Sequence, residues 1–256
     1  RDNFSDLNHR LGLAYAPAPG QKLRVVYQRW RRTAANGSLG PVDTLGIPVD
    51  DRLVESGGLL RRARVQYDWH TGSDSFLQAF ADQRQVRNLA SATTAQFRVF
   101  GVSELDALRA RKPVLGEAFD DLEKTPVFLQ GRVSSIGMAG NWLLSPSLTV
   151  AARYTLADGR NSSAAFNGNE VPYIPRHFAN LSAFWQASGS WLVGLSANYR
   201  SSRFADEANA VAMEAGWVFG ITSFWESDDK RWTIEAGLTN LHANKRSAAE
   251  RRARAV

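Results

Sequence analysis

Histidine and cysteine supply many catalytic and metal-binding side chains, and this sequence is poor in both. Its 256 residues include four histidines and no cysteine, which excludes disulfides, thiolate metal sites and thiol nucleophiles. None of His9, His70, His177 and His242 pairs at the spacing of metal ligands or lies in a motif typical of a catalytic triad. We therefore predict no catalytic, cofactor-binding or metal-binding residue. His177, beside Arg176, is the one candidate if the protein is a hydrolase.

Arginine is the more abundant chemical group, and the net charge is +6. A basic chain raises nucleic acid as a partner. However, much of the excess lies in the last residues, KRSAAERRARAV, and the other arginines are spread through strand-like segments without interleaved stacking aromatics. We therefore expect no nucleic-acid partner.

Most of those arginines lie in segments where apolar and polar residues alternate. In the stretch 188–201, SGSWLVGLSANYRS, the odd positions from Trp191 to Tyr199 are apolar, and Gly194, Ser196, Asn198 and Arg200 sit between them. Period-two alternation predicts a β-strand with one apolar face. That face could line the core of a soluble sandwich or contact lipid on the outside of a barrel.

We identify ten such segments, and the connections between them alternate in length. They are residues 8–16, 22–33, 59–69, 75–85, 130–142, 147–157, 177–186, 190–200, 214–225 and 230–241. Short turns such as PAPGQ and ASGS alternate with four long connections. Bacterial outer-membrane barrels have short periplasmic turns and long extracellular loops. The alternation therefore predicts an all-β fold, an antiparallel up-and-down transmembrane β-barrel segment of about ten strands.

The tryptophans support a membrane location. Six of the eight lie within a few residues of a short turn: Trp69, Trp142, Trp185, Trp191, Trp225 and Trp232. Indole prefers the membrane interface, so we interpret these six as a periplasmic aromatic girdle. The alternative is that tryptophans close the end of a soluble core.

With the apolar face toward lipid, the opposite face is polar and faces the lumen. Its arginines are Arg24, Arg62, Arg64, Arg153 and Arg200. They could attract an anionic ligand or contact a plug domain, or they could pair with neighbouring carboxylates. Strand 75–85 is ambiguous, because Phe76 and Phe80 share a face with Gln78 and Asp82.

The long connection 86–129 contains two further features. Its acidic residues Glu117, Asp120, Asp121 and Glu123 could bind a divalent ion that bridges lipopolysaccharide, or they could belong to a solvated loop. The segment SELDALRARK, beginning at Ser103, predicts a short helix with a serine cap. Outer-membrane lipid and lipopolysaccharide are the partners that this location implies.

The C-terminal third resembles the last strands of TonB-dependent outer-membrane receptors. The resemblance covers about residues 171–246 and consists of a V-P-x-x-P-R-H entry, a W-x-x-G-L-x-x-x-Y-R strand, an R-F-A-D-E-x-N loop and a strand ending G-x-x-N-L. Receptors of this family have a plug inside a larger barrel and import nutrients such as iron chelates with energy from TonB. The resemblance implies the same uptake function, no enzymatic activity, and a location in the outer membrane of a Gram-negative bacterium.

The sequence also departs from the family pattern. It shows no plug and no TonB box, and HANKRSAAERRARAV replaces the expected aromatic last strand. Ten strands would leave both ends on the long-loop side, so we expect residues 1–241 to be a partial barrel that does not transport alone, and 242–256 an irregular basic tail. An export or diffusion pore fused to periplasmic repeats and an outer-membrane hydrolase remain as alternative functions.

Overall fold

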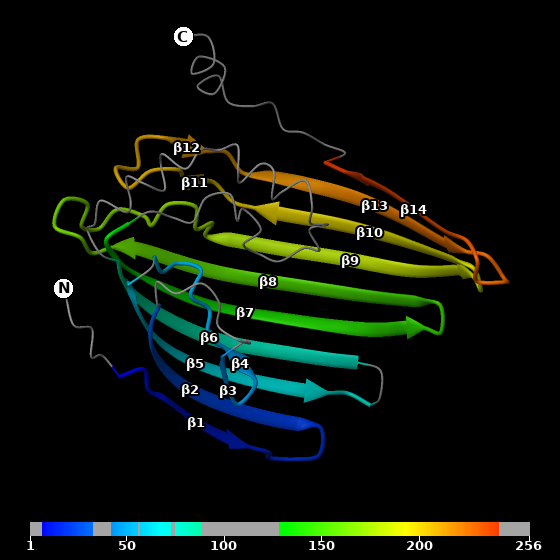
Figure 1. Ribbon diagram of the computed structural model, residues 1–256, viewed down its shortest axis with the longest axis horizontal. Coiled ribbons are helices and arrows are strands. Elements are labelled where there is room, and N and C mark those ends of the chain that lie inside the picture. Colours follow the sequence, from blue (N-terminus) through cyan, green and yellow to red (C-terminus); the bar gives the residue numbers. More distant parts are fainter. Residues whose placement is uncertain (1–6, 33–41, 56, 73–74, 89–127, 241–256) are drawn as a thin grey trace, which may run out of the picture.

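The computed structural model describes residues 7–32, 42–55, 57–72, 75–88 and 128–240. Within these residues, β-strands are the only helices or strands, and turns and loops connect them (Figure 1). None of these residues forms a helix long and apolar enough to cross a membrane. The predicted insert helix at 103, the acidic group at 117–123 and the basic tail all lie outside the described residues.

One antiparallel sheet of ten strands contains every predicted segment. In sheet order its strands are β1 (Arg10–Tyr15), β2 (Gln21–Arg31), β5 (Leu59–His70), β6 (Ser75–Arg87), β7 (Gln130–Ser145), β8 (Leu148–Asn161), β9 (His177–Ser188), β10 (Trp191–Arg200), β13 (Gly216–Glu226) and β14 (Thr233–Thr239). Each strand pairs with its neighbour along the chain, apart from the small hairpins inserted in two loops. The all-β, up-and-down antiparallel prediction is therefore confirmed.

The long connections contain structure that the sequence analysis missed. The loop after β2 forms the hairpin β3 (Asp43–Thr44) and β4 (Ile47–Pro48), and the loop after β10 forms β11 (Arg203–Phe204) and β12 (Ala212–Met213). Strands β7 and β8 also extend a few residues beyond the predicted ends, because their pairing continues from Gly131↔Asn161 to Ser145↔Leu148.

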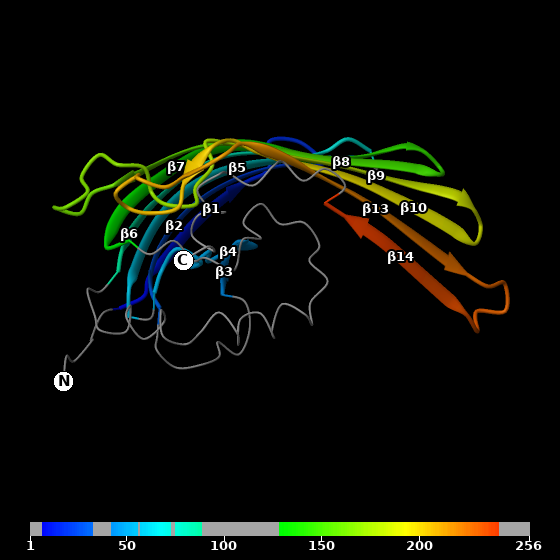
Figure 2. The same ribbon diagram turned by 90° about the horizontal axis from the view of Figure 1, so that it is seen from above.

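The sheet curves into an arc, and β3 and β4 lie on its concave side (Figure 2). The two faces differ as the alternation predicts. Apolar side chains on the convex face are open to the surroundings: Leu13 is 70% exposed, Leu181 51% and Ile234 59%. On the concave face Gln28 is 0% exposed and Gln66 4%. This is the reverse of a soluble protein, in which the apolar face is buried.

A small hydrophobic core lies at the long-loop end of the concave face. Loop residues Leu53, Val54, Phe128, Val171 and Ile174 pack there against strand residues Leu60, Val86, Val133 and Ala157. The loops are therefore packed onto the inner surface of the sheet at this end.

Candidate functional site

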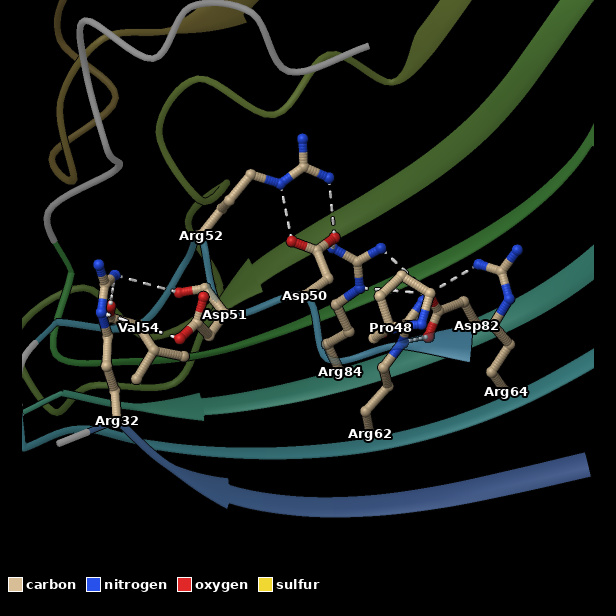
Figure 3. Close-up of polar contacts among 10 residues, drawn as sticks. All are labelled: Arg32, Pro48, Asp50, Asp51, Arg52, Val54, Arg62, Arg64, Asp82 and Arg84. Carbon is tan, nitrogen blue, oxygen red and sulfur yellow. Dashed lines mark hydrogen bonds and ion pairs between the residues drawn. The ribbon is translucent and has the colours of Figure 1, made fainter. Parts of the chain in front are cut away.

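The concave face of β5 and β6 carries a cluster of charged side chains. Alternation along β5 places Arg62 and Arg64 on this face, and the register sets Arg62 opposite Arg84 and Arg64 opposite Asp82 on β6. All four side chains are almost completely buried. Buried charges are stable only when paired and hydrogen-bonded, and Figure 3 shows how these pair.

Asp82 is the centre of the cluster, because three guanidinium groups donate to its carboxylate. Arg62 Nη2 lies 2.7 Å from Asp82 Oδ2, Arg84 Nη2 3.0 Å and Arg64 Nη1 3.3 Å. Arg62 Nε adds a bond of 2.9 Å to Oδ1. The Asp82 side chain is completely buried, so this carboxylate is held in one position by its arginines.

A second carboxylate reaches the cluster from the loop after β4. Asp50 Oδ2 lies 2.7 Å from Arg84 Nη1, and Arg52 Nε donates to Asp50 Oδ1 at 2.7 Å. Burial alone would raise the pKa of Asp50, but the charges of Arg84 and Arg52 and the Arg52 hydrogen bond hold that pKa well below its usual range. Asp50 is therefore ionised at neutral pH. Four guanidinium groups share two carboxylates here, so the cluster is positively charged.

The same face holds the hairpin β3–β4 against the sheet. Arg24 Nη1 donates to the Leu45 carbonyl at 2.7 Å, Gln28 Nε2 to Ile47 at 3.0 Å and Arg62 Nη1 to Pro48 at 2.8 Å. Arg32, just after β2, donates to the Val54 carbonyl at 2.8 Å (Figure 3). Side chains of the concave face therefore fix residues 44–54 inside the arc.

Arg64 is the member of the cluster with spare hydrogen-bonding capacity. Its Nε donates to Gln66 Oε1 at 2.9 Å, and its Cζ lies 4.1 Å from the centre of the Phe80 ring. Within the described residues, its Nη2 has no hydrogen-bond partner, whereas all three guanidinium nitrogens of Arg62 and of Arg84 have one. The cation–π contact also explains why Phe80, which left the facing of residues 75–85 ambiguous, lies on the concave face.

The five predicted lumen arginines all lie on the concave face by register, but they do not form one group. Arg24 pairs with Asp68, its Nε donating to Oδ2 at 2.9 Å, next to the Asp82 cluster that includes Arg62 and Arg64. Arg153 on β8 and Arg200 on β10 lie three and five strands from β5. Arg153 is opposite Asn180, and Arg200 opposite Phe178. Carboxylate pairing, one of the two interpretations left open, holds for Arg24, Arg62 and Arg64. Contact with a ligand or plug stays a prediction.

The other carboxylates and arginines of the site were missed by sequence reasoning. Alternation could have found Asp82 and Arg84, because they share a face with Gln78 in strand 75–85. Strand order also predicts that the strand carrying Asp68 pairs with the strand carrying Arg24. Nothing in the sequence indicates that Asp50 and Arg52, which lie in a connection, return to the sheet.

The six predicted girdle tryptophans lie at the short-turn end of the sheet, on the convex face. The register sets Trp191 directly opposite Trp225, and Trp185 opposite Val193. Trp232, just before β14, is 70% exposed. Contact of these rings with a membrane interface stays a prediction.

His177, the hydrolase candidate, lies on the convex side. Its Nδ1 is 2.7 Å from the Tyr154 hydroxyl. Within the described residues no group of three or more histidine, aspartate or glutamate side chains could hold a metal ion. The geometry around His177 gives no support to a catalytic triad.

Comparison with known proteins identifies the family of this sheet. Residues 121–241 match the family model described as TonB-dependent receptor-like, beta-barrel. This segment belongs to a TonB-dependent receptor barrel. Strands β1 to β6 continue the same sheet without a break in pairing. A search of curated proteins found no match.

Solved structures of TonB-dependent receptor type share the fold. The ferric yersiniabactin uptake receptor FyuA from Yersinia pestis superposes with a TM-score of 0.60 at 13% identity over 92% of this chain and 33% of its own. The siderophore receptor PiuA from Acinetobacter baumannii gives 0.60 at 13% identity over 91% and 31%. The ferric citrate transporter FecA gives 0.57 at 14% identity over 91% and 32%. The chain thus spans about a third of the length of these receptors.

Proposed function

We propose that this chain is part of an outer-membrane receptor that takes up a nutrient such as an iron chelate. The observation that carries the proposal is the division of the TonB-dependent receptor sheet into an apolar convex face and a charged concave face. The convex face suits contact with lipid, and the concave face suits a polar lumen. A plug domain, TonB and the outer membrane of a Gram-negative bacterium are the partners and location that belong to this proposal.

The charge of the concave cluster indicates that the ligand or plug surface in contact with it is negatively charged. Iron chelates with carboxylate or catecholate groups are anionic, and four guanidinium groups around two carboxylates attract anions. Arg64 is the residue best placed to donate, because its Nη2 is unoccupied within the described residues. We propose Arg24, Arg62, Arg64, Arg153 and Arg200 as the lumen surface for ligand or plug contact, with Arg64 as the main donor.

Uptake of radiolabelled ferric chelates by cells that produce the receptor of which this chain is proposed to be a part tests this function. We expect uptake that depends on TonB, that is lost when the gene is deleted, and that Arg64→Gln weakens. Arg231→Gln, an exposed substitution in the β13–β14 turn, is the matched control and should leave uptake unchanged. Passage of small solutes without TonB would indicate a diffusion pore, and outward transport an export pore. A hydrolytic activity lost in His177→Ala would indicate the hydrolase.

A further inference from the structure

Residues 43–54, which we call the strap, offer their oxygen atoms to the concave face of the sheet. The donors are Arg10 on β1, Arg24 and Gln28 on β2, Arg62 on β5 and Arg84 on β6. The acceptors are the carbonyl oxygens of residues 43, 45, 47 and 48 and the carboxylate of Asp50. In each of these bonds a strand donates and the strap accepts. The sheet thus binds the strap as it would bind a ligand rich in oxygen atoms.

Asp50 is the charged acceptor of this set, and two guanidinium groups hold it. Arg84 Nη1 lies 2.7 Å from Asp50 Oδ2 (Figure 3). On the other side, Arg52 Nε donates to Oδ1 at 2.7 Å and Arg52 Nη2 to Oδ2 at 3.0 Å. Paired bonds of this kind are how arginine recognises carboxylates. Arg52 and Arg84 therefore form a carboxylate site, and Asp50 is the carboxylate that occupies it.

A ligand with several carboxylates can make more bonds here than Asp50 does. Arg64 Nη1 and Arg84 Nη2 both lie within hydrogen-bond distance of Asp82 Oδ2, so one small molecule can reach both arginines. Arg64 Nη2 has no partner in the part of the chain that the structure describes. Once one carboxylate is bound at Arg84, pairing of a second with Arg64 is intramolecular, which raises the affinity of the ligand.

The tip of the strap has a strained backbone. Its turn residues Leu45 and Gly46 both have positive φ, 54° and 74°. Hairpin turns of this type favour Asn-Gly, because a left-handed conformation brings the Cβ of a residue such as leucine too close to the following carbonyl oxygen. The Leu45 side chain is 40% exposed, whereas its carbonyl is held by Arg24. Loss of the bonds to the sheet would let this turn relax, which favours departure of the strap.

Space for a ligand lies between the strap and the short turns. A hollow of about 760 Å³ opens there on the concave face, and Lys22, Arg24, Asp68 and His70 contribute to its lining. Arg24 belongs both to this lining and to the contacts of the strap. Departure of the strap therefore joins the hollow to the surface that the strap covers.

We propose that the strap is an internal competitor for a polycarboxylate ligand. Asp50 occupies the carboxylate site in the absence of ligand, and a polycarboxylate replaces it, pairs also with Arg64 and displaces residues 43–50 from the sheet. Leu53 and Val54 remain in the hydrophobic core and form the fixed end of the strap. The inference deepens the proposed function and rests on it, since it takes the concave face as the surface that meets the ligand.

Titration of the detergent-purified chain with tricarballylate, a metal-free tricarboxylate, tests the proposal. Isothermal calorimetry measures the dissociation constant, and hydrogen exchange of residues 43–50 reports the strap. Exchange of these residues should rise with the same midpoint as binding, because a short hairpin released from the sheet is not stable in water. Strands β7 and β8 should stay protected, which shows that the sheet remains folded.

Two variants should change the affinity in opposite directions. Asp50→Asn removes the competing charge and should bind tricarballylate on the order of tenfold more tightly, with fast exchange of the strap before ligand is added. Adding Arg84→Gln to this variant should remove the gain. Leu45→Asn relieves the strained turn, holds the strap more firmly and should bind roughly fivefold more weakly.

The matched control is Asp229→Asn, which makes the same charge change in the exposed β13–β14 turn and should bind like the wild type. The proposal is overturned if tricarballylate does not bind, if it binds without faster exchange of the strap, or if Asp50→Asn binds no more tightly than the wild type. The same rise in exchange with sodium chloride at equal ionic strength would also overturn it. TonB-dependent uptake without this response of the strap rejects the inference alone, whereas the response without uptake rejects the transport function and keeps the carboxylate site.

Discussion

Asp82 illustrates how a charge is kept stable on the inner face of this sheet. Its carboxylate accepts from Arg62, Arg64 and Arg84 and is completely shielded from solvent. Removing one partner of a buried ion pair leaves the remaining charge without compensation. Arg62 and Arg64 therefore depend on this carboxylate, whereas Arg84 also pairs with Asp50.

Asp82→Asn should lower the free energy of unfolding by roughly 3–5 kcal/mol, the usual cost of breaking a buried ion pair. Urea unfolding in detergent micelles, followed by tryptophan fluorescence, measures this change. Asp158→Asn breaks the exposed pair with Arg160, whose side chains are 60% and 53% exposed, and should cost only about 0–1 kcal/mol. Equal losses in the two variants would contradict the account of the cluster.

Asp50 makes the packing of its loop dependent on pH. Its folded-state pKa lies below the ordinary value of 3.8, so its ion pairs contribute fully at neutral pH. That contribution is lost as the pH falls below 3.8 toward the folded-state pKa. Hydrogen exchange of residues 47–54 should therefore accelerate between neutral pH and about pH 3, beyond the intrinsic pH effect. Asp50→Asn should exchange rapidly at both pH values; a variant that kept the wild-type acid response would refute the role of Asp50.

At the scale of elements, the hairpin β3–β4 depends on a glycine in the facing strand. A Cβ atom on Gly12 of β1 would lie 2.7 Å from Leu45 Cδ1 and 2.9 Å from Thr44 Cγ2. The hairpin can therefore approach the sheet only because this position has no side chain.

Gly12→Val should displace the hairpin and destabilise the protein by roughly 1–3 kcal/mol, the typical effect of overpacking. Hydrogen exchange of residues 43–48 should rise while that of β7 and β8 stays unchanged. Gly189→Val is the control, because no atom lies within 4 Å of a Cβ there. Unchanged protection of the hairpin in Gly12→Val would show that its contacts with β1 are not needed.

The strands were more predictable than the loops, for a physical reason. Alternation is a local property, so Leu195 and Ser196 could be assigned to opposite faces from the sequence alone. Alternation along β5 likewise placed Arg62 and Arg64 on one face, and strand order followed from the short turns. The return of Asp50 to the sheet depends on Arg84, distant in sequence, and no local pattern encodes it. Phe80 was ambiguous because its ring contacts Arg64, which lies on the neighbouring strand.

At the scale of the whole molecule, the two faces of the arc have opposite chemistry. Exposed apolar side chains such as Leu13, Leu181 and Ile234 cover the convex surface. The concave surface carries the docked hairpin (Figure 2) and the charged cluster (Figure 3). This arrangement, together with the family match at residues 121–241, supports a wall that separates lipid from a polar lumen.

Cysteine accessibility along β10 tests that central claim most directly. The chain has no native cysteine, so each single substitution introduces the only thiol. In outer membranes, Val193→Cys and Leu195→Cys should react with a lipid-soluble maleimide and resist a water-soluble one, whereas Ser196→Cys and Asn198→Cys should show the opposite preference. Equal water accessibility on both faces, or the reverse alternation, would contradict the placement of the convex face in lipid.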